Sequence, residues 1–460
     1  MAGVGFALRD LARADDLLGV ARAYLHATII ASGPWLATIL ALGTLSIVAG
    51  GDALGEEVAL FRLCVIYNFG FSLILTGPIA IVATRFLADR IYERDVTAAP
   101  GMLLGACALT ALTQGAPVAV FYFVFVEAPW PVRLAATIGY LVTAYLWIAA
   151  VFLTALKDYS AIAASFAVGM ATGFLAGWAL APLGPAGLLF GFSAGLATVL
   201  FAIVARIFAE YPYPAARPFE FLVYFRRYWD LALTALAYNA AIWVDKWVMW
   251  TAPRAETMAG VLVSYPDYDS AMFLAYLTIL PAMALFVLLV ETSFYERYLA
   301  FFREIRTHGT WMRLQIAHRN VVDAVGEGFR LLVVVQGAVS YLAILLAPAI
   351  FEALGIGFSQ IGMFRFGVLG AMFHAMLLFV LIVFAYFDLR LLALKLALFF
   401  LAGNLLLSVA TLQAGFEWYG YGYFLSAASS FAVGYWIMLR KLGNLPYLAF
   451  VEINPSVRRD

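Results

Sequence analysis

The chain has 460 residues, of which 65% are hydrophobic and only 12% are charged, and its formal net charge is zero. A soluble domain is typically about half apolar and about a quarter charged, so this composition excludes an ordinary soluble enzyme. It fits a protein whose outer surface faces lipid. The neutral charge balance gives no indication of nucleic-acid binding. Cys64 and Cys107 both lie in apolar segments, so no disulfide framework is expected.

The first segment, residues 1–23, is not expected to be a cleavable signal peptide, because it carries mixed charges and lacks an apolar core followed by small residues. Its apolar residues, among them Phe6, Leu11 and Leu17, fit one face of a helix. We therefore expect an amphipathic cytoplasmic segment that lies on the membrane surface.

Twelve apolar stretches follow, each long enough to cross a bilayer of about 30 Å as a helix. The fold class expected is therefore an all-α polytopic membrane protein of about twelve transmembrane helices. The fifth and sixth stretches meet at a tight turn, Ala181–Pro185, which could instead be a break in a longer element. The stretches are 24–49, 59–85, 101–126, 133–156, 160–181, 185–207, 230–252, 270–294, 328–350, 364–387, 391–413 and 420–439.

The positive charges test this count. If the N-terminus is cytoplasmic, every alternate loop is rich in Lys and Arg, as the positive-inside bias requires. Only five of the 28 Lys and Arg residues fall on the outer side, and one miscounted helix would scramble the pattern. Both termini are therefore expected in the cytoplasm, the C-terminus as a tail, residues 440–460. The five exceptions are Arg62, Arg133, Lys246, Arg254 and Arg365.

The chain also divides into halves. A cytoplasmic loop, residues 208–229, separates six stretches from six. Pro78 precedes Tyr92-Glu93-Arg94 by the same fourteen residues that separate Pro281 from Tyr295-Glu296-Arg297. This repeat favours two bundles of the same orientation, an N-lobe at 24–207 and a C-lobe at 230–439, which could rock about a central site.

The stretch 230–252 carries the most suggestive polar pattern. Amide, charged and aromatic side chains recur there at helical spacing, and aromatic rings stack on sugars while amides and charges bond hydroxyl or N-acetyl groups. We interpret them as candidates for lining a substrate path. They are Tyr238, Asn239, Trp243, Asp245, Lys246 and Trp250.

The alternative interpretation is that these residues have an ordinary structural role. Lys246 lies close to the outer end of its helix and could extend its ammonium group to the interface. Trp247 and Trp250 could belong to the aromatic belt of the membrane.

The second stretch offers further path candidates in Arg62, Tyr67 and Asn68. Asn68 belongs to a ladder with Cys64, Ser72 and Thr76 at intervals of four residues. Such polar side chains also hold membrane helices together, which is the alternative role for this ladder. Arg62 could pair with a carboxylate such as Asp245.

Three further features are a carboxylate, three prolines and a histidine within the apolar stretches. Glu291 near the cytoplasmic end of its helix is a gating or coupling candidate, or else a partner of an arginine. Pro34, Pro78 and Pro281 are expected to break or kink their helices. His374, within the stretch 364–387, is expected to be a hydrogen-bonded core residue rather than a proton relay.

No enzyme signature is present. The sequence has no P-loop and no HExxH motif, and neither a cofactor nor a metal site is expected. The loop 296–327 interleaves aromatic and basic residues, including Tyr298, Phe302 and Trp311. It is typical of surface helices that lie on anionic lipid or dock a cytoplasmic partner.

Four segments together resemble a known family. They are MAGVGFALRDL at the start, Ser32-Gly-Pro-Trp35, the stretch YNFGFSLILTGPIAIVATRFLADRIY from Tyr67, and WVDKW from Trp243. In these segments the chain resembles the PelG family of bacterial inner-membrane exopolysaccharide exporters, in the polysaccharide-transporter branch of the MOP superfamily. The likeness covers essentially the whole length.

The resemblance implies two six-helix lobes around a central cavity, as in MATE-like flippases. It implies a substrate rich in N-acetylgalactosamine, exported from cytoplasm to periplasm and made by a cytoplasmic glycosyltransferase. A membrane partner that senses cyclic di-GMP is also implied, with the loops 296–327 and 208–229 as docking candidates. It supplies no catalytic residues. The alternatives are a MATE-like antiporter, a flippase for lipid-linked oligosaccharides, and a scaffold that conducts nothing.

Overall fold

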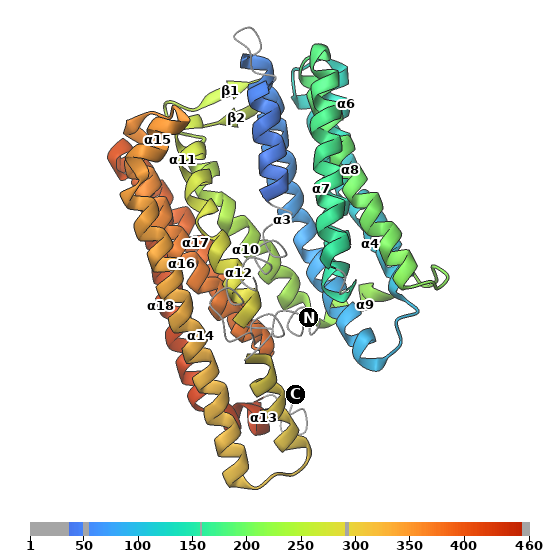
Figure 1. Cartoon of the computed structure of the whole chain (residues 1–460), viewed down its shortest axis with the longest axis vertical. Helices are drawn as coiled ribbons and strands as arrows, with labels where there is room; N and C mark the ends of the chain where they lie inside the picture. The colour runs from blue at the N-terminus through green and yellow to red at the C-terminus, as the bar shows by residue number, and fades with distance from the viewer. Residues whose placement is uncertain (1–35, 49–54, 157–158, 290–293, 453–460) are drawn as a thin grey trace. The chain divides into compact units, whose positions relative to one another are not determined.

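The computed structural model describes residues 36–48, 55–156, 159–289 and 294–452, and these are almost entirely helical (Figure 1). The predicted surface segment 1–23, Pro34, Glu291 and the last residues of the tail lie outside the described residues.

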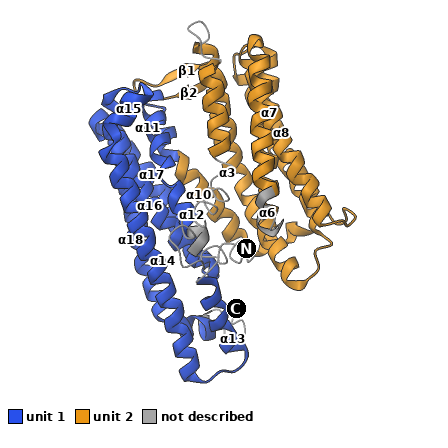
Figure 2. Cartoon of the chain, viewed as in Figure 1, with its two compact units in different colours: residues 1–32, 244–252, 266–460 blue, residues 33–243, 253–265 orange. Residues whose placement is uncertain are grey.

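The chain forms two compact units, which Figure 2 distinguishes by colour. Unit 2 contains the described residues between 33 and 243 together with Pro253–Tyr265. Unit 1 contains Val244–Ala252 and the described residues from Pro266 onward. One helix, α10 (Trp229–Met249), therefore has residues in both units.

Unit 2 consists mainly of long helices joined by short turns. Besides the first part of α10, its helices are Leu36–Val48, α3 (Gly55–Glu93), α4 (Ala99–Thr110), α5 (Ala116–Val120), α6 (Trp130–Leu156), α7 (Tyr159–Leu180), α8 (Pro185–Glu210) and α9 (Val223–Arg227). π-helical turns at Ala111–Gly115 and Phe121–Phe125 flank α5, and 3-10 turns lie at Ala181–Leu183 and Glu220–Leu222. The antiparallel strands β1 (Glu256–Met258) and β2 (Leu262–Ser264) complete the unit.

Unit 1 is also helical, and its first two helices are short. Its elements are α11 (Pro266–Leu277), α12 (Leu280–Leu289), α13 (Tyr295–Arg306), α14 (Trp311–Leu345), α15 (Ala347–Leu354), a 3-10 turn at Phe358–Gln360, α16 (Ile361–Tyr386), α17 (Arg390–Ala414), a 3-10 turn at Phe416–Trp418, α18 (Tyr421–Gly443), α19 (Leu445–Tyr447) and a π-helical turn at Leu448–Glu452.

Ten helical segments in the described part of the chain are long and apolar enough to cross a membrane. Two predicted spans are not among the ten. The stretch 24–49 is described only as the shorter apolar helix Leu36–Val48, and 230–252 corresponds to α10, which carries Asp230, Asp245 and Lys246 among its apolar residues. The protein is thus a multi-pass helical membrane protein, and the number twelve stays a prediction.

Residues 181–185 form a turn rather than a break in one element. Gly184 has φ of +68°, which reverses the chain, and α7 then packs along α8. The two helices approach closely because glycines face each other: a Cβ on Gly195 would meet the Cα of Gly173 at 2.6 Å. Small residues at an interface are the usual means by which membrane helices pack.

Pro78 and Pro281, the two of these prolines that the structure describes, differ in their effect on the helix. Pro78 does not break its helix, because α3 is helical from Gly55 to Glu93 with Pro78 inside it, and a kink there stays a prediction. A proline removes one backbone hydrogen bond, and neighbouring helices in a membrane can compensate for that loss. At Pro281 the chain is interrupted, since α11 ends at Leu277 and α12 begins at Leu280.

Candidate functional site

The predicted path residues fall in both units. Unit 2 contains Arg62, Tyr67, Asn68, Tyr238, Asn239 and Trp243, and unit 1 contains Asp245, Lys246 and Trp250. Arg62 is exposed on α3 and Tyr238 is half-buried on α10. The remaining predicted residues make hydrogen bonds or packing contacts. Most of their partners are residues that the sequence did not single out.

Asn68 is the centre of a buried polar group in unit 2. Its Nδ2 donates to the carbonyl of Ala136 on α6 at 3.0 Å, and its Oδ1 accepts from the Tyr122 hydroxyl at 2.7 Å. Asn68 is 3% exposed and Tyr122 is 1% exposed. Asn68 therefore joins three helical segments, as buried polar groups in membranes commonly do.

A second buried group lies two turns further along α3. Gln114 Nε2 donates to Thr76 Oγ1 at 3.2 Å, and the Tyr140 hydroxyl donates to Gln114 Oε1 at 2.9 Å. Between the two groups, the indole of Trp147 donates to Ser72 Oγ at 3.1 Å. The ladder predicted on α3 thus bonds to α6 and to the segment Ala99–Phe125, in accordance with the helix-joining role.

Tyr67 holds the β-hairpin of unit 2. Its hydroxyl donates to the carbonyl of Val263 at 3.0 Å and accepts from the Val263 amide at 2.9 Å. The turn of the hairpin bonds to the segment before α6, where the Glu127 amide donates to the Ala259 carbonyl at 2.8 Å. These bonds attach residues 256–264 to α3 at Tyr67.

Asn239 and Trp243 pack directly on α3. Asn239 Nδ2 donates to the carbonyl of Leu73 at 3.0 Å, close to Pro78 in the sequence. The indole of Trp243 lies against Gly70, where an added Cβ would meet the ring at 2.9 Å. Both side chains are only partly exposed, and part of each forms helix packing.

Asp245 and Lys246 form a buried ion pair in unit 1. Lys246 Nζ lies 3.2 Å from Asp245 Oδ2, and the two side chains are 11% and 0% exposed. The Tyr268 hydroxyl donates to the same Oδ2 at 3.0 Å, and Lys246 Nζ lies 4.6 Å from the centre of the Tyr276 ring. A carboxylate, an ammonium group and two phenols thus gather between α10 and α11.

A chain of polar contacts continues through unit 1. Trp250 Nε1 donates to Asp269 Oδ2 at 3.0 Å at the start of α11. There Gln360 also bonds Asp267, at 2.8 Å. His374 Nδ1 lies 2.9 Å from the Tyr423 hydroxyl and is buried, so its expected hydrogen-bonded position in the core is confirmed.

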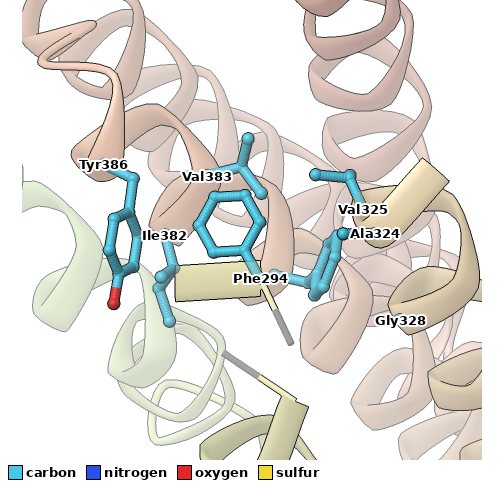
Figure 3. A pocket seen from close by; sticks show the side chains of 8 residues that line it. Phe294, Ala324, Val325, Gly328, Ile382, Val383 and Tyr386 are labelled. Carbon is cyan, nitrogen blue, oxygen red and sulfur yellow. The ribbon is translucent and has the colours of Figure 1, made fainter. Parts of the chain in front are cut away.

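Figure 3 shows an apolar cavity inside unit 1, between α14 and α16. The ring of Phe294 lies among Val325, Ile382 and Val383, and the cavity measures about 10 Å³. That volume holds about one water molecule and no sugar ring. No group of three or more His, Cys, Asp or Glu side chains within the described ranges could hold a metal ion.

Comparison with known proteins identifies the family. Residues 1–450 match the family model PelG, "Putative exopolysaccharide Exporter (EPS-E)". No curated protein matches the sequence.

Solved structures share the fold over nearly the whole chain. An outward-facing multidrug resistance MATE family transporter of the MOP superfamily has a TM-score of 0.57 and 18% identity, covering 97% of this chain and 99% of its own. A MOP superfamily transporter from Pyrococcus furiosus has a TM-score of 0.58 and 17% identity, covering 98% and 99%. A MATE transporter in the bent conformation has a TM-score of 0.58 and 16% identity, covering 97% and 98%. At these identities the likeness establishes a MATE/MOP transporter fold alone.

Proposed function

The chain belongs to the PelG family of exopolysaccharide exporters, and from this premise we propose that it moves an exopolysaccharide from cytoplasm to periplasm. The observation that supports the proposal most is the joint occurrence of a family match over residues 1–450 and a MATE/MOP transporter fold. The location proposed is the bacterial inner membrane, with both termini cytoplasmic. Movement would follow from rocking of two lobes about a central path.

The substrate we propose is a Pel-like polymer rich in N-acetylgalactosamine. Aromatic and amide side chains suit such a neutral sugar, and Tyr238, Asn239 and Trp243 are partly exposed on α10. Arg62 offers an exposed guanidinium on α3. Asp245 and Lys246 neutralise each other, so their pair adds no net charge that would favour an ionic substrate.

Deletion of the gene tests this function. We expect a deletion strain to make polymer that stays inside the cell, and a plasmid copy to restore secretion. Equal amounts of secreted polymer in the deletion strain and its parent would contradict export by this chain.

Partner docking is proposed for the helical hairpin formed by α13 and the first half of α14, which Figure 1 shows side by side. Trp311 is 61% exposed and Met312 is 67% exposed, and Arg303, Arg306 and Arg313 are exposed around them. If the membrane span begins near residue 328, Trp311 lies about 25 Å further along the helix. That distance exceeds the depth of the headgroups and favours a soluble, acidic partner surface over lipid.

The partner proposed is the cytoplasmic glycosyltransferase, with a membrane protein that senses cyclic di-GMP in the same complex. Co-purification with Trp311→Ala plus Arg313→Glu tests this docking. The glycosyltransferase should be lost with this variant and retained with Trp418→Ala, an exposed tryptophan on the predicted periplasmic side. Undiminished co-purification would contradict docking at the hairpin, and loss of binding to anionic vesicles instead would assign the hairpin to lipid.

A MATE-like antiporter is the second candidate, and the buried carboxylate of Asp245 favours it. Antiport requires a group that exchanges a coupling ion, so Asp245→Asn should abolish uptake of a tracer cation or drug into vesicles. An exporter driven by polymer synthesis needs no such exchange, and its vesicles should show no ion-driven uptake.

A further inference from the structure

The interruption between α11 and α12 changes the backbone hydrogen bonds at the end of α11. Thr278 and Ile279 join the two helices, and their amides bond the carbonyls of Ala275 and Tyr276, three residues back instead of four. Pro281 has no N–H, so the carbonyl of Leu277 has no donor four residues ahead. The Leu277 carbonyl at the C-terminal end of α11 therefore lacks its helical donor, in a stretch that is partly exposed.

Gln336 on α14 reaches this interruption. Its side chain is 0% exposed, and its Nε2 donates to the carbonyl of Thr278 at 3.1 Å and lies 3.4 Å from Ser340 Oγ. Oε1 of the same amide has no hydrogen-bond partner in the part of the chain that the structure describes. A buried amide oxygen without a donor costs about 1–3 kcal/mol, so it indicates a ligand that supplies positive charge or a hydrogen.

The chemistry of the position favours a cation. The C-terminal end of a helix carries a partial negative charge, and the groups that the Gln336 amide bonds are further oxygen atoms, from Thr278 and Ser340. Interrupted membrane helices coordinate Na⁺ through such carbonyls. Because these oxygens are neutral, a divalent ion, which prefers carboxylates, is disfavoured.

We propose that the interruption between α11 and α12 binds a monovalent cation of the size of Na⁺. Gln336 Oε1 and the Leu277 carbonyl are its two principal ligands. Ser340 Oγ completes the protein's contribution. This site is independent of the polymer, so it can be tested whether or not the export proposal holds.

Thermal unfolding of the purified full chain in detergent, followed by tryptophan fluorescence, tests the site. Sodium chloride is compared with choline chloride at equal ionic strength. Sodium should raise Tm saturably, by roughly 2 °C or more at saturation, because a ligand of the folded state stabilises it. Gln336→Leu should abolish this shift, and Gln336→Glu should lower the sodium concentration at which half of it is reached.

Gln114→Leu is the matched control, because Gln114 is also a buried glutamine in a membrane helix but both ends of its amide are bonded. It should lower Tm and leave the sodium shift intact. Identical unfolding of the wild type in sodium and choline would overturn the proposal and assign the position to a water molecule. A sodium shift that survives in Gln336→Leu would also overturn it. If Gln336→Leu does not fold, the sodium shift in Tm of the wild type and of Gln336→Glu still tests the proposal.

Discussion

Tyr268 and Asp245 are joined by a hydrogen bond of 3.0 Å to the carboxylate oxygen that Lys246 approaches to 3.2 Å. All three side chains are buried, so the charges compensate each other only while the pair is complete. Removing one partner of a buried ion pair costs about 3–5 kcal/mol, while removing both can be nearly neutral.

We therefore expect Lys246→Met and Asp245→Asn each to lower Tm strongly and the double variant to lower it less than either. Thermal unfolding of the four proteins in a double-mutant cycle measures this. Additive losses would show that the two charges do not stabilise each other. Secretion assays on the folded double variant then separate roles, since a residue on the sugar path should lower export even where stability is restored.

Tyr122→Phe should destabilise unit 2. The substitution removes the 2.7 Å hydrogen bond to Asn68 Oδ1 and leaves that buried oxygen without its donor, at a cost of about 1–3 kcal/mol. Tm in detergent is the measurement. Tyr145→Phe is the control, because Tyr145 is a half-buried tyrosine of α6 that takes no part in the Asn68 group. A control that falls as far as Tyr122→Phe would contradict a specific role for the Asn68 bond.

Tyr67→Phe should release the β-hairpin while leaving the helices intact. Both bonds to Val263 depend on the lost hydroxyl group. Hydrogen exchange followed by mass spectrometry should show faster exchange over residues 256–264 and unchanged exchange in α3. The Tyr122→Phe protein should not show this local effect, and equal protection of the hairpin in Tyr67→Phe would refute the attachment.

Gly105→Ala should displace the predicted inter-lobe loop, residues 208–229. A Cβ on Gly105 would collide with the backbone of Pro218. A side chain could rotate away from such a collision, but the backbone cannot, so the loop itself has to move. Limited trypsin digestion should then cut faster at Arg226 or Arg227, in the same loop. Gly115→Ala is the matched control in the same membrane segment, because no atom lies within 4 Å of its added Cβ. Similar digestion of both variants would contradict the contact.

Much of the fold could be predicted from sequence, because lipid demands long apolar helices and the loops between them alternate between many and few positive charges. The hydrogen-bond and ion-pair partners of the candidate site residues could not be predicted from sequence. Helical spacing placed Asp245 and Lys246 on neighbouring faces, whereas the flexible lysine stem turns back to form an ion pair. Tyr268 and Tyr122 are ordinary aromatic residues in sequence and become partners only through helix packing.

The helix boundaries show the same limit. Hydropathy predicted a span from residue 328, but α14 begins at Trp311, where the Thr310 side chain caps it by accepting from the Arg313 amide. The polar residues before 328 continue the same helix, and hydropathy does not detect them. Pro78 and Pro281 are equivalent in the repeat, yet only the second coincides with an interruption. The effect of each proline depends on the side chains and helices that surround it, and the spacing of the sequence does not show these.

Export itself is tested most directly with inverted membrane vesicles, whose cytoplasmic face points outward. Vesicles from cells with and without the chain are supplied with labelled sugar nucleotide and then treated with a glycoside hydrolase that cannot cross the membrane. If this chain exports the polymer, labelled polymer survives inside vesicles that contain it and is digested in vesicles that lack it. Equal survival in both preparations would contradict the account.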